Sequence, residues 1–434
     1  MLIKSSTAAI ALLYASTVAA AGIHTNADSV TKRYLQKRGV SSTSPLTSVS
    51  GDIIYSVPLG LGTPAQQFNL AIDTGSPITW VVANVCTSGE CSKVSNHFNC
   101  AASSTCQQSS TPFNISYVDS SEVAGSYISE QYTLGSLSFK GAVGLVTTDN
   151  SALAPTVDGI MGLWYLPQAS DVPILNVLKN SSILAQPQIG IWLRGANATA
   201  SADADPSTEP NAPGGEITFG GADPNRYTGN ISYVDCGGDS PWTIPVGGMM
   251  VNGQSINTTG AMATLDTGTS LMLVSQTVSD AINGAIPGAI KDSKVGWFLP
   301  CTGNYSITIT FGTRNVTIPY TALAVQDQTA RADDGSLMCL SAAMYPTGDT
   351  ATISDWLLGD AFLKNVYTVF DFSTPKGRIG LASLAGSGNG TGNGSNNLSN
   401  ADDNAAAGGR RGMMSSGSML QALSVVAGLL VALA

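Results

Sequence analysis

The sequence predicts an all-β protein assembled from two related halves, and two observations carry that prediction. Apolar and β-branched runs are short and are broken repeatedly by Gly, Asn and Pro, with glycine supplying 47 of the 434 residues; this is typical of chains built from short strands. A tetrapeptide also occurs twice: residues 73–76 read Asp-Thr-Gly-Ser, and residues 266–269 read Asp-Thr-Gly-Thr. Apolar residues flank both copies, which indicates a buried strand that ends in a tight glycine turn presenting a carboxylate.

The repeated aspartates, Asp73 and Asp266, are the first candidates for chemistry. A buried carboxylate is unfavourable unless it is paired or hydrogen-bonded, so two of them in matching settings predict two half-sites that face each other. Asp-Thr-Gly is also ordinary turn chemistry, and a single copy would carry little weight. The matching flanks of the two copies favour the catalytic interpretation over two unrelated turns.

Charge and composition narrow the functional classes. The chain has 19 basic and 29 acidic residues, and residues 39–434 alone carry a net charge of −14. Nucleic-acid binding depends on clustered Lys and Arg, so we expect no nucleic-acid partner. An acidic chain suits work at low pH, where protonation removes much of the self-repulsion. His24 lies in a segment that we expect to be removed, and His97 reads as a plain loop residue, so we expect no metal and no cofactor.

The N-terminal region reads as signals for export and processing. Residues 1–21 combine Lys4, a short apolar core and small-residue cleavage sites, which predicts a signal peptide. The apolar run is too short for a membrane-spanning helix. Residues 22–38 are expected to be a pro-segment because they contain the dibasic pairs Lys32-Arg33 and Lys37-Arg38. The sequence is then that of a zymogen, whose mature chain begins near residue 39.

Further segments resemble, in the right order, those of the pepsin-like aspartic proteases. The matching segments are Gly62 to Gln66, Asp73 to Trp80, Ile115 to Tyr117, Val157 to Leu163, Leu265 to Leu271, Trp356 to Phe362, Tyr367 to Asp371 and Arg378 to Ala382. Residues 115–117 are similar to the flap hairpin of that family, and residues 157–163 and 356–362 to the segments that support its two aspartates. The resemblance implies a bilobal fold, with a central cleft between two related β-barrel-like lobes.

The resemblance also implies roles around the two aspartates. Asp73 and Asp266 would share one proton and activate a water for attack on a peptide bond. The expected loop-support residues are Thr74, Gly75, Ser76, Thr267, Gly268 and Thr269. Of these, the threonines at positions 74 and 267 would tie the two loops together, and the hydroxyls at positions 76 and 269 would form hydrogen bonds beside the carboxylates.

The same resemblance implies a flap that closes over the substrate. Tyr117 would cover the substrate, Trp80 would hydrogen-bond to that tyrosine, and Ile160 would line the substrate pocket. Tyr117 as an ordinary strand aromatic is the alternative. Asp119 and Glu122 either solvate the hairpin or attract basic side chains of the substrate. Asp360 is expected to be structural, since its segment lies behind the active site in that family.

Two features of the flap depart from the family pattern. Val118 stands where a glycine usually follows the flap tyrosine, and a glycine would let a hairpin tip bend freely. Asn114-Ile115-Ser116 is a glycosylation sequon that abuts Tyr117. A glycan at this place is expected to crowd the cleft.

Seven cysteines fit an oxidising compartment. The four cysteines between residues 86 and 106 allow three pairings. By resemblance to the family, Cys86 pairs with Cys91, which would leave Cys100 and Cys106 for each other. The resemblance likewise pairs Cys301 with Cys339. Cys236 is left over, either as a buried free thiol or with a partner that the sequence does not reveal.

The C-terminal region changes composition after residue 384. Residues 385–404 are rich in Gly, Ser and Asn and predict a flexible linker. Residues 405–434 combine small residues with a short apolar end, which predicts the signal for a glycosylphosphatidylinositol (GPI) anchor. The expected attachment residue is Asn404, with Ala407 as the second choice. A spanning helix is the alternative, but it needs a longer apolar run.

Ten Asn-x-Ser/Thr sequons accompany these signals and favour a glycosylated, exported protein. They start at Asn114, Asn180, Asn197, Asn230, Asn257, Asn304, Asn315, Asn389, Asn393 and Asn397.

Together these features predict an N-terminal lobe with the flap over residues 39–230 and a C-terminal lobe over residues 231–384. The expected function is an aspartic endopeptidase of the fungal, yapsin-like type that cleaves extended peptides and proteins at acidic pH. We expect a monomer that passes through the secretory pathway and is held by its lipid anchor at the plasma membrane or cell wall, with a fraction released. The alternative is a catalytically impaired pepsin-fold protein that serves in wall binding or adhesion.

Overall fold

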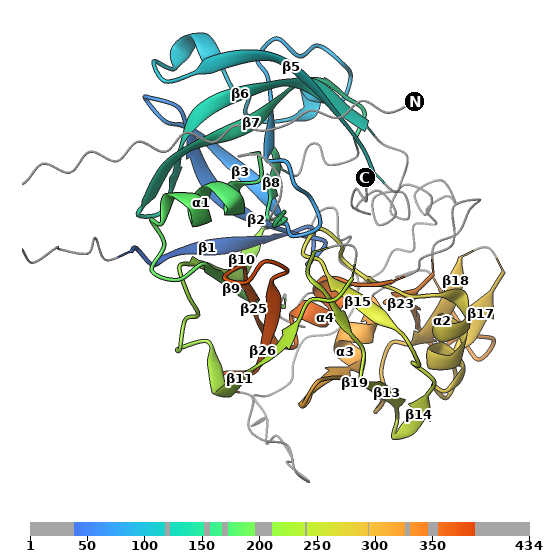
Figure 1. Ribbon diagram of the computed structural model, residues 1–434. Coiled ribbons are helices and arrows are strands. Elements are labelled where there is room, and N and C mark those ends of the chain that lie inside the picture. The colour runs from blue at the N-terminus through green and yellow to red at the C-terminus, as the bar shows by residue number, and fades with distance from the viewer. Residues whose placement is uncertain are drawn as a thin grey trace, which may run out of the picture. The chain divides into compact units, whose positions relative to one another are not determined.

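The computed structural model describes residues 39–386, with gaps at 118–121, 152–156, 167–171, 196–210, 239–240, 294, 326–329 and 346–354. The expected signal peptide, pro-segment and anchor signal lie outside the described residues, as do Val118, Asp119, Asn404 and the expected linker after residue 386. Strands dominate the described part, so the predicted all-β class is confirmed (Figure 1). No helix within these residues is both long and apolar enough to cross a membrane.

The N-terminal half of the described chain consists mainly of strands. The strands are β1 (Ser42–Val49), β2 (Ile54–Leu61), β3 (Gln66–Asp73), β4 (Trp80–Val82), β5 (Gln107–Ser116), β6 (Glu122–Leu134), β7 (Leu137–Asp149), β8 (Gly159–Gly162), β9 (Gln188–Leu193), β10 (Ala212–Phe219) and β11 (Tyr227–Asp235). The helical elements are η1 (Cys91–Lys93), η2 (Cys100–Ala102) and α1 (Ile174–Ser181). Buried and exposed residues alternate along β1, which is the period-two pattern of a half-buried strand.

The C-terminal half has shorter strands. They are β12 (Thr243–Pro245), β13 (Gly248–Val251), β14 (Gln254–Ile256), β15 (Met262–Leu265), β16 (Met272–Leu273), β17 (Ile290–Asp292), β18 (Gly296–Pro300), β19 (Ser306–Phe311), β20 (Arg314–Pro319), β21 (Ala324–Val325), β22 (Met338–Ser341), β23 (Ala343–Met344), β24 (Trp356–Leu358), β25 (Tyr367–Asp371) and β26 (Arg378–Leu384). The helices are α2 (Gln276–Gly284), α3 (Tyr320–Leu323) and α4 (Asp360–Leu363).

One large sheet joins the two ends of the described chain. It has 13 strands in the order β11-β26-β25-β9-β10-β1-β2-β3-β8-β4-β7-β6-β5. The last two strands of the chain thus pair beside β9 and β11 (Figure 1). Residue 230, the end expected for the N-terminal lobe, lies within β11. The remaining described strands form sheets of five, four and four strands, all in the C-terminal half.

The repeated tetrapeptide belongs to a repeated strand arrangement. β3 runs parallel to β8, with Asp73 opposite Gly162, and β8 pairs antiparallel with β4. Correspondingly, β15 runs parallel to β24, with Leu265 opposite Leu358, and β24 pairs antiparallel with β16. Each tetrapeptide therefore connects two strands that flank the same third strand, as two related halves require.

Disulfides close three loops within the described residues. They join Cys86 to Cys91, Cys100 to Cys106 and Cys301 to Cys339. The structure thus selects one of the three pairings that the sequence left open near the N-terminus. Cys236 is a buried free thiol among the described residues, and burial raises its pKa to about 12. A thiol with so high a pKa stays protonated at physiological pH.

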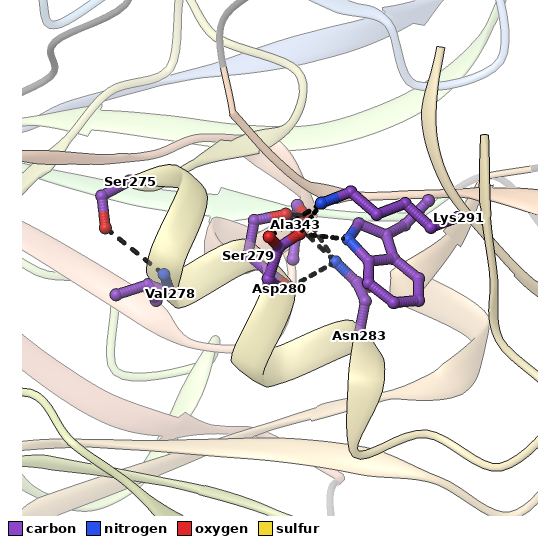
Figure 2. A network of polar contacts seen from close by, with 8 residues as sticks. Ser275, Val278, Ser279, Asp280, Asn283, Lys291 and Ala343 are labelled. Atoms are coloured by element: carbon purple, nitrogen blue, oxygen red, sulfur yellow. Dashed lines mark hydrogen bonds and ion pairs between the residues drawn. The ribbon is translucent and has the colours of Figure 1, made fainter. Parts of the chain in front are cut away.

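A polar network connects α2 to β17, β18 and β23 (Figure 2). Asp280 accepts hydrogen bonds from Lys291 Nζ at 2.6 Å and from Trp297 Nε1 at 2.8 Å. Asn283 Nδ2 donates to the carbonyl oxygen of Ala343 at 3.0 Å. Since Ala343 belongs to β23, which pairs with β16, the network supports the strand that leaves the second loop.

Candidate active site

The two repeated aspartates lie side by side. Asp73 ends β3, and Asp266 directly follows β15. The backbone N–H of Gly75 donates to Asp73 Oδ1 at 2.9 Å and also to Asp266 Oδ1 at 3.1 Å. Both aspartates are almost fully buried, with exposed fractions of 1% and 0%. One amide therefore bridges two carboxyl groups that are shielded from bulk water.

Reciprocal threonine bonds lock the two loops to each other. Thr74 N–H donates to Thr267 Oγ1 at 3.1 Å, and Thr267 N–H donates to Thr74 Oγ1 at 3.0 Å. Each hydroxyl then donates to a carbonyl of the opposite loop: Thr74 Oγ1 to Leu265 at 3.0 Å, and Thr267 Oγ1 to Ile72 at 2.9 Å. Because all these groups are buried and satisfied, the distance between the carboxyl groups is fixed by backbone as well as by side chains.

The hydroxyls at positions 76 and 269 differ in a way that the sequence did not predict. Thr269 Oγ1 donates to Asp266 Oδ2 at 2.6 Å. Ser76 Oγ is buried and has no hydrogen-bond partner among the described residues, so the expected bond from Ser76 is not formed. Asp266 is also held by the N–H of Gly268 at 2.9 Å. The second loop therefore gives its carboxylate a hydroxyl donor that the first loop does not provide.

Burial raises the pKa of both aspartates, and the charge of Asp266 raises the pKa of Asp73 further. The pKa of Asp73 lies well above its usual range, first because of burial and then because of the neighbouring charge of Asp266. Burial also raises the pKa of Asp266, but the hydroxyl of Thr269 and the N–H of Gly268 oppose that rise. Since two close carboxylates resist double ionisation, the pair retains one proton over a wide pH range.

Three of the residues expected at the flap and the substrate pocket lie together in the structure. Tyr117 directly follows β5, is 8% exposed, and packs in one apolar cluster with Trp80 and Ile160. Trp80 Nε1 donates to Tyr117 Oη at 2.8 Å. Ile160 pairs in register with Ala71 on β3, close to Asp73. Tyr117 is thus fixed by a specific bond, which an ordinary strand aromatic would not need.

Replacing Trp80 by Phe is expected to lower kcat/KM about tenfold, the loss that corresponds to one hydrogen bond of about 1.4 kcal/mol. The change removes the donor to Tyr117 Oη and keeps an aromatic ring in the apolar cluster. Steady-state cleavage of a peptide measures the effect. Trp192→Phe is the matched control, because Trp192 stacks on Arg226 in a separate cluster. Equal losses in both variants would contradict the role of Trp80.

Asp360 is a third buried carboxyl group in this region. It begins α4, is 1% exposed, and neither carboxyl oxygen has a hydrogen-bond partner among the described residues. Burial raises its pKa well above the usual range, Lys364 opposes this rise, and the charges of Asp266, Asp52 and Asp73 add to it. The sequence analysis did not single out Asp52 or Lys364, which form an ion pair at 3.4 Å across 312 residues of chain. Nothing in the local sequence signals that pair.

Asp360→Asn is expected to stabilise the protein at neutral pH and not in acid. A carboxyl group with a raised pKa stabilises the fold below its unfolded pKa, near 3.8, and loses this contribution as the pH rises through the folded pKa. The amide cannot ionise, so the variant should have a higher free energy of unfolding than the parent protein at pH 7. Melting temperatures at pH 3 and pH 7 measure the difference.

Asp280→Asn is the matched control for that experiment. Its bonds to Lys291 and Trp297 lower the pKa of Asp280 against the effect of its slight burial, so the sign reverses. This variant should lose stability at pH 7 and not at pH 3. A shift of Asp360→Asn that is the same at both pH values would contradict the assignment.

Metal-binding side chains do not gather near this site. Among the residues that the structure describes, no group of three or more His, Cys, Asp or Glu is arranged to hold a metal ion. His97, one of the two histidines, places Nε2 2.9 Å from the carbonyl oxygen of Cys91. That histidine therefore contributes to its own loop, as the sequence analysis expects.

The fold and the site together define a class of protein. The two Asp-Thr-Gly loops follow the same strand arrangement in each half. They bring two buried carboxyl groups within hydrogen-bond distance of one backbone N–H. This is the construction of an aspartic-type endopeptidase, in which two carboxylates activate a water.

Comparison with known proteins gives the family. The chain belongs to the eukaryotic aspartyl proteases, whose family model matches residues 54–384. It is 28% identical over 375 residues to major aspartyl peptidase 1 of Cryptococcus neoformans var. grubii. This alignment covers 82% of this chain and 73% of that protein. It is 30% identical over 365 residues to pepsin A of Canis lupus familiaris, covering 82% of this chain and 87% of the pepsin. The predicted bilobal pepsin-like fold and the aspartic endopeptidase activity are thereby confirmed.

Proposed function

We propose that the chain is a surface-tethered aspartic endopeptidase that cleaves extended peptides at acidic pH, with Asp73 and Asp266 as its catalytic residues. The single observation that carries this proposal is the Gly75 N–H, which donates to both carboxyl groups within 3.1 Å. A shared donor holds the carboxyl groups close enough to share one proton and one water.

The donors around the pair decide which carboxyl group keeps the proton. Asp266 receives the Thr269 hydroxyl and the N–H groups of Gly268 and Gly75, whereas Ser76 Oγ donates to neither aspartate. Hydrogen bonds to a charged carboxylate favour its ionised form. The negative charge therefore resides mainly on Asp266, and the shared proton resides mainly on Asp73.

Hydrolysis then follows from these two protonation states. Asp266 takes a proton from the water as the water oxygen attacks the scissile carbonyl carbon. Asp73 donates its proton to the carbonyl oxygen, where negative charge develops. When the tetrahedral intermediate collapses, Asp266 gives the proton that it took from the water to the leaving nitrogen, Asp73 takes a proton back from a hydroxyl of the intermediate, and the C–N bond breaks. Atoms and charges balance without a covalent intermediate.

An acidic optimum follows from the same pair. The reaction needs one proton on the pair, and deprotonation of Asp73 at higher pH removes the donor to the carbonyl oxygen. The net charge of −14 over residues 39–434 adds to this preference, because protonation reduces self-repulsion in acid. Activity should therefore fall from acid toward neutral pH as Asp73 loses its proton.

The flap supplies the cover over the substrate in this proposal. Tyr117, held by Trp80 Nε1, closes over an extended peptide that pairs with the flap as an added strand. Glu122 lies exposed at the start of β6. Together with Asp119, it would attract basic side chains of the substrate.

The terminal segments support the cellular part of the proposal. The signal peptide and dibasic pro-segment indicate export, and the linker with its small-residue and apolar tail indicates a lipid anchor at Asn404. We propose a yapsin-like, monomeric enzyme at the plasma membrane or cell wall. Detergent extraction before and after phospholipase C tests the anchor, and a protein that is freely soluble from the start would refute it.

Casein digestion between pH 3 and pH 7, with and without pepstatin, tests the activity. We expect cleavage that is strongest in acid and is abolished by pepstatin. Cleavage that is unaffected by pepstatin would contradict a two-carboxylate mechanism.

A further inference from the structure

The flap strand β5 presents two different faces. Phe113 and Ile115 are buried, and the next inward residue is Tyr117. Asn114 and Ser116 alternate with them and are exposed. Because successive side chains of a strand point to opposite faces, Asn114 projects away from the face that carries Tyr117. Asn114-Ile115-Ser116 thus places a glycosylation sequon on the outer face of the flap.

The side chain of Asn114 is available for modification. Among the described residues, no hydrogen bond engages its amide group. Two other sequon asparagines differ: Asn257 Oδ1 accepts from Thr259 N–H at 3.0 Å, and Asn315 Oδ1 accepts from Thr310 Oγ1 at 2.8 Å. The amide of Asn114 therefore loses no protein contact when a sugar is attached.

The surroundings of Asn114 leave room for a first sugar. Its cross-strand neighbour on β6 is Ala124, which in turn lies opposite Thr148 on β7. Ala124 is half-buried and Thr148 is exposed, so the outer face beside Asn114 carries small side chains. β5 is also the last strand of the 13-stranded sheet. A sugar on its outer face would hinder other chains from pairing with this open edge.

We infer that Asn114 carries an N-linked glycan that covers the outer face of the flap strand and leaves the aspartate pair accessible. The structure thereby corrects the expectation that a glycan beside Tyr117 would crowd the cleft, because the two side chains lie on opposite faces of β5. This inference rests on the proposed export, since the sugar is added only in the secretory pathway.

The test uses the full chain expressed in a eukaryotic secretory host. Peptide mass spectrometry after enzymatic deglycosylation in heavy-oxygen water marks each occupied asparagine. Asn114→Gln and Ser116→Ala should each remove one glycan, whereas Ser116→Thr keeps the sequon and should keep the glycan. The other exposed sequons, whose occupancy reports export itself, are Asn180, Asn230, Asn257, Asn304 and Asn315.

Activity measured on the same variants tests the orientation of the sugar. With the glycan on the outer face, Asn114→Gln should change kcat/KM by no more than about twofold, well below the tenfold that 1.4 kcal/mol represents. A rise of tenfold or more on losing the glycan would overturn the outward orientation. If Asn114 is unmodified while the other sequons are occupied, the glycan at Asn114 is refuted and the proposed export stands. A protein with no occupied sequon would overturn both this site and the proposed export.

Discussion

Asp73→Asn is expected to lower kcat by about 10²- to 10⁴-fold, the range that a positioned general acid or base supplies. The amide cannot give its proton to the carbonyl oxygen of the substrate, and it no longer shares a proton with Asp266. Asp266→Asn should be as damaging, because it removes the base that activates the water. Stopped assays with a long peptide, run at pH 3 to 5, measure both losses.

The melting temperature of each variant is the control that separates a loss of activity from a loss of fold. Burial raises the pKa of Asp73, so a neutral side chain at this place should not lower the melting temperature at pH 7. Asp235→Asn, at an exposed position of β11, should keep full activity. Undiminished cleavage by well-folded Asp73→Asn protein would end the two-carboxylate proposal.

Gly359→Ala is expected to destabilise the protein by about 3 kcal/mol or more, the upper end of the effect of overpacking a core. A Cβ at Gly359 would lie 1.9 Å from the carbonyl oxygen of Thr269 and 2.4 Å from that of Leu271. Both oxygens belong to backbone that cannot move aside without shifting the second aspartate loop. Chemical denaturation measures the loss.

Gly162 is the equivalent position in the first half, and we expect Gly162→Ala to destabilise the protein as well. A Cβ at Gly162 would lie 2.7 Å from the carbonyl oxygen of Ser76, the residue that corresponds to Thr269. Gly248→Ala is the matched control, because a Cβ there meets no atom within 4 Å. Gly359→Ala protein with the stability of the control would show that the loop is less tightly packed than the structure indicates.

The sequence predicted the centre of the site because its signals are local and repeated. Asp73 and Asp266 share their flanks, and the apolar-apolar-Gly segments that end at Gly162 and Gly359 follow the same pattern. Tyr117 and Trp80 stand at family-like positions in the sequence, and the structure joins them by a hydrogen bond. Such features need only short-range patterns and a count of residues.

The remaining features depend on contacts between distant parts of the chain. The hydroxyl of Thr269 donates to an aspartate and the hydroxyl of Ser76 does not. This difference depends on how each hydroxyl is oriented, and the residue type alone does not reveal the orientation. The ion pair of Asp52 with Lys364 beside Asp360 joins residues far apart in sequence. The pairing of β25 with β9 and of β26 with β11 also has no signal in the local sequence. For the same reason, a lobe boundary at residue 230 falls inside a strand.

The position of β1 sets a limit on where the N-terminus can be trimmed. β1 lies between β10 and β2 in the 13-stranded sheet. Just before it, Val40 N–H donates to Ile183 at 2.6 Å and the Val40 carbonyl accepts from Ala185 at 2.9 Å. A recombinant form that starts beyond β1 would leave two interior strands with open edges, which invite aggregation. The processing that we propose, after Arg38, would leave this strand intact, whereas a cut about a dozen residues later would remove β1 from the sheet.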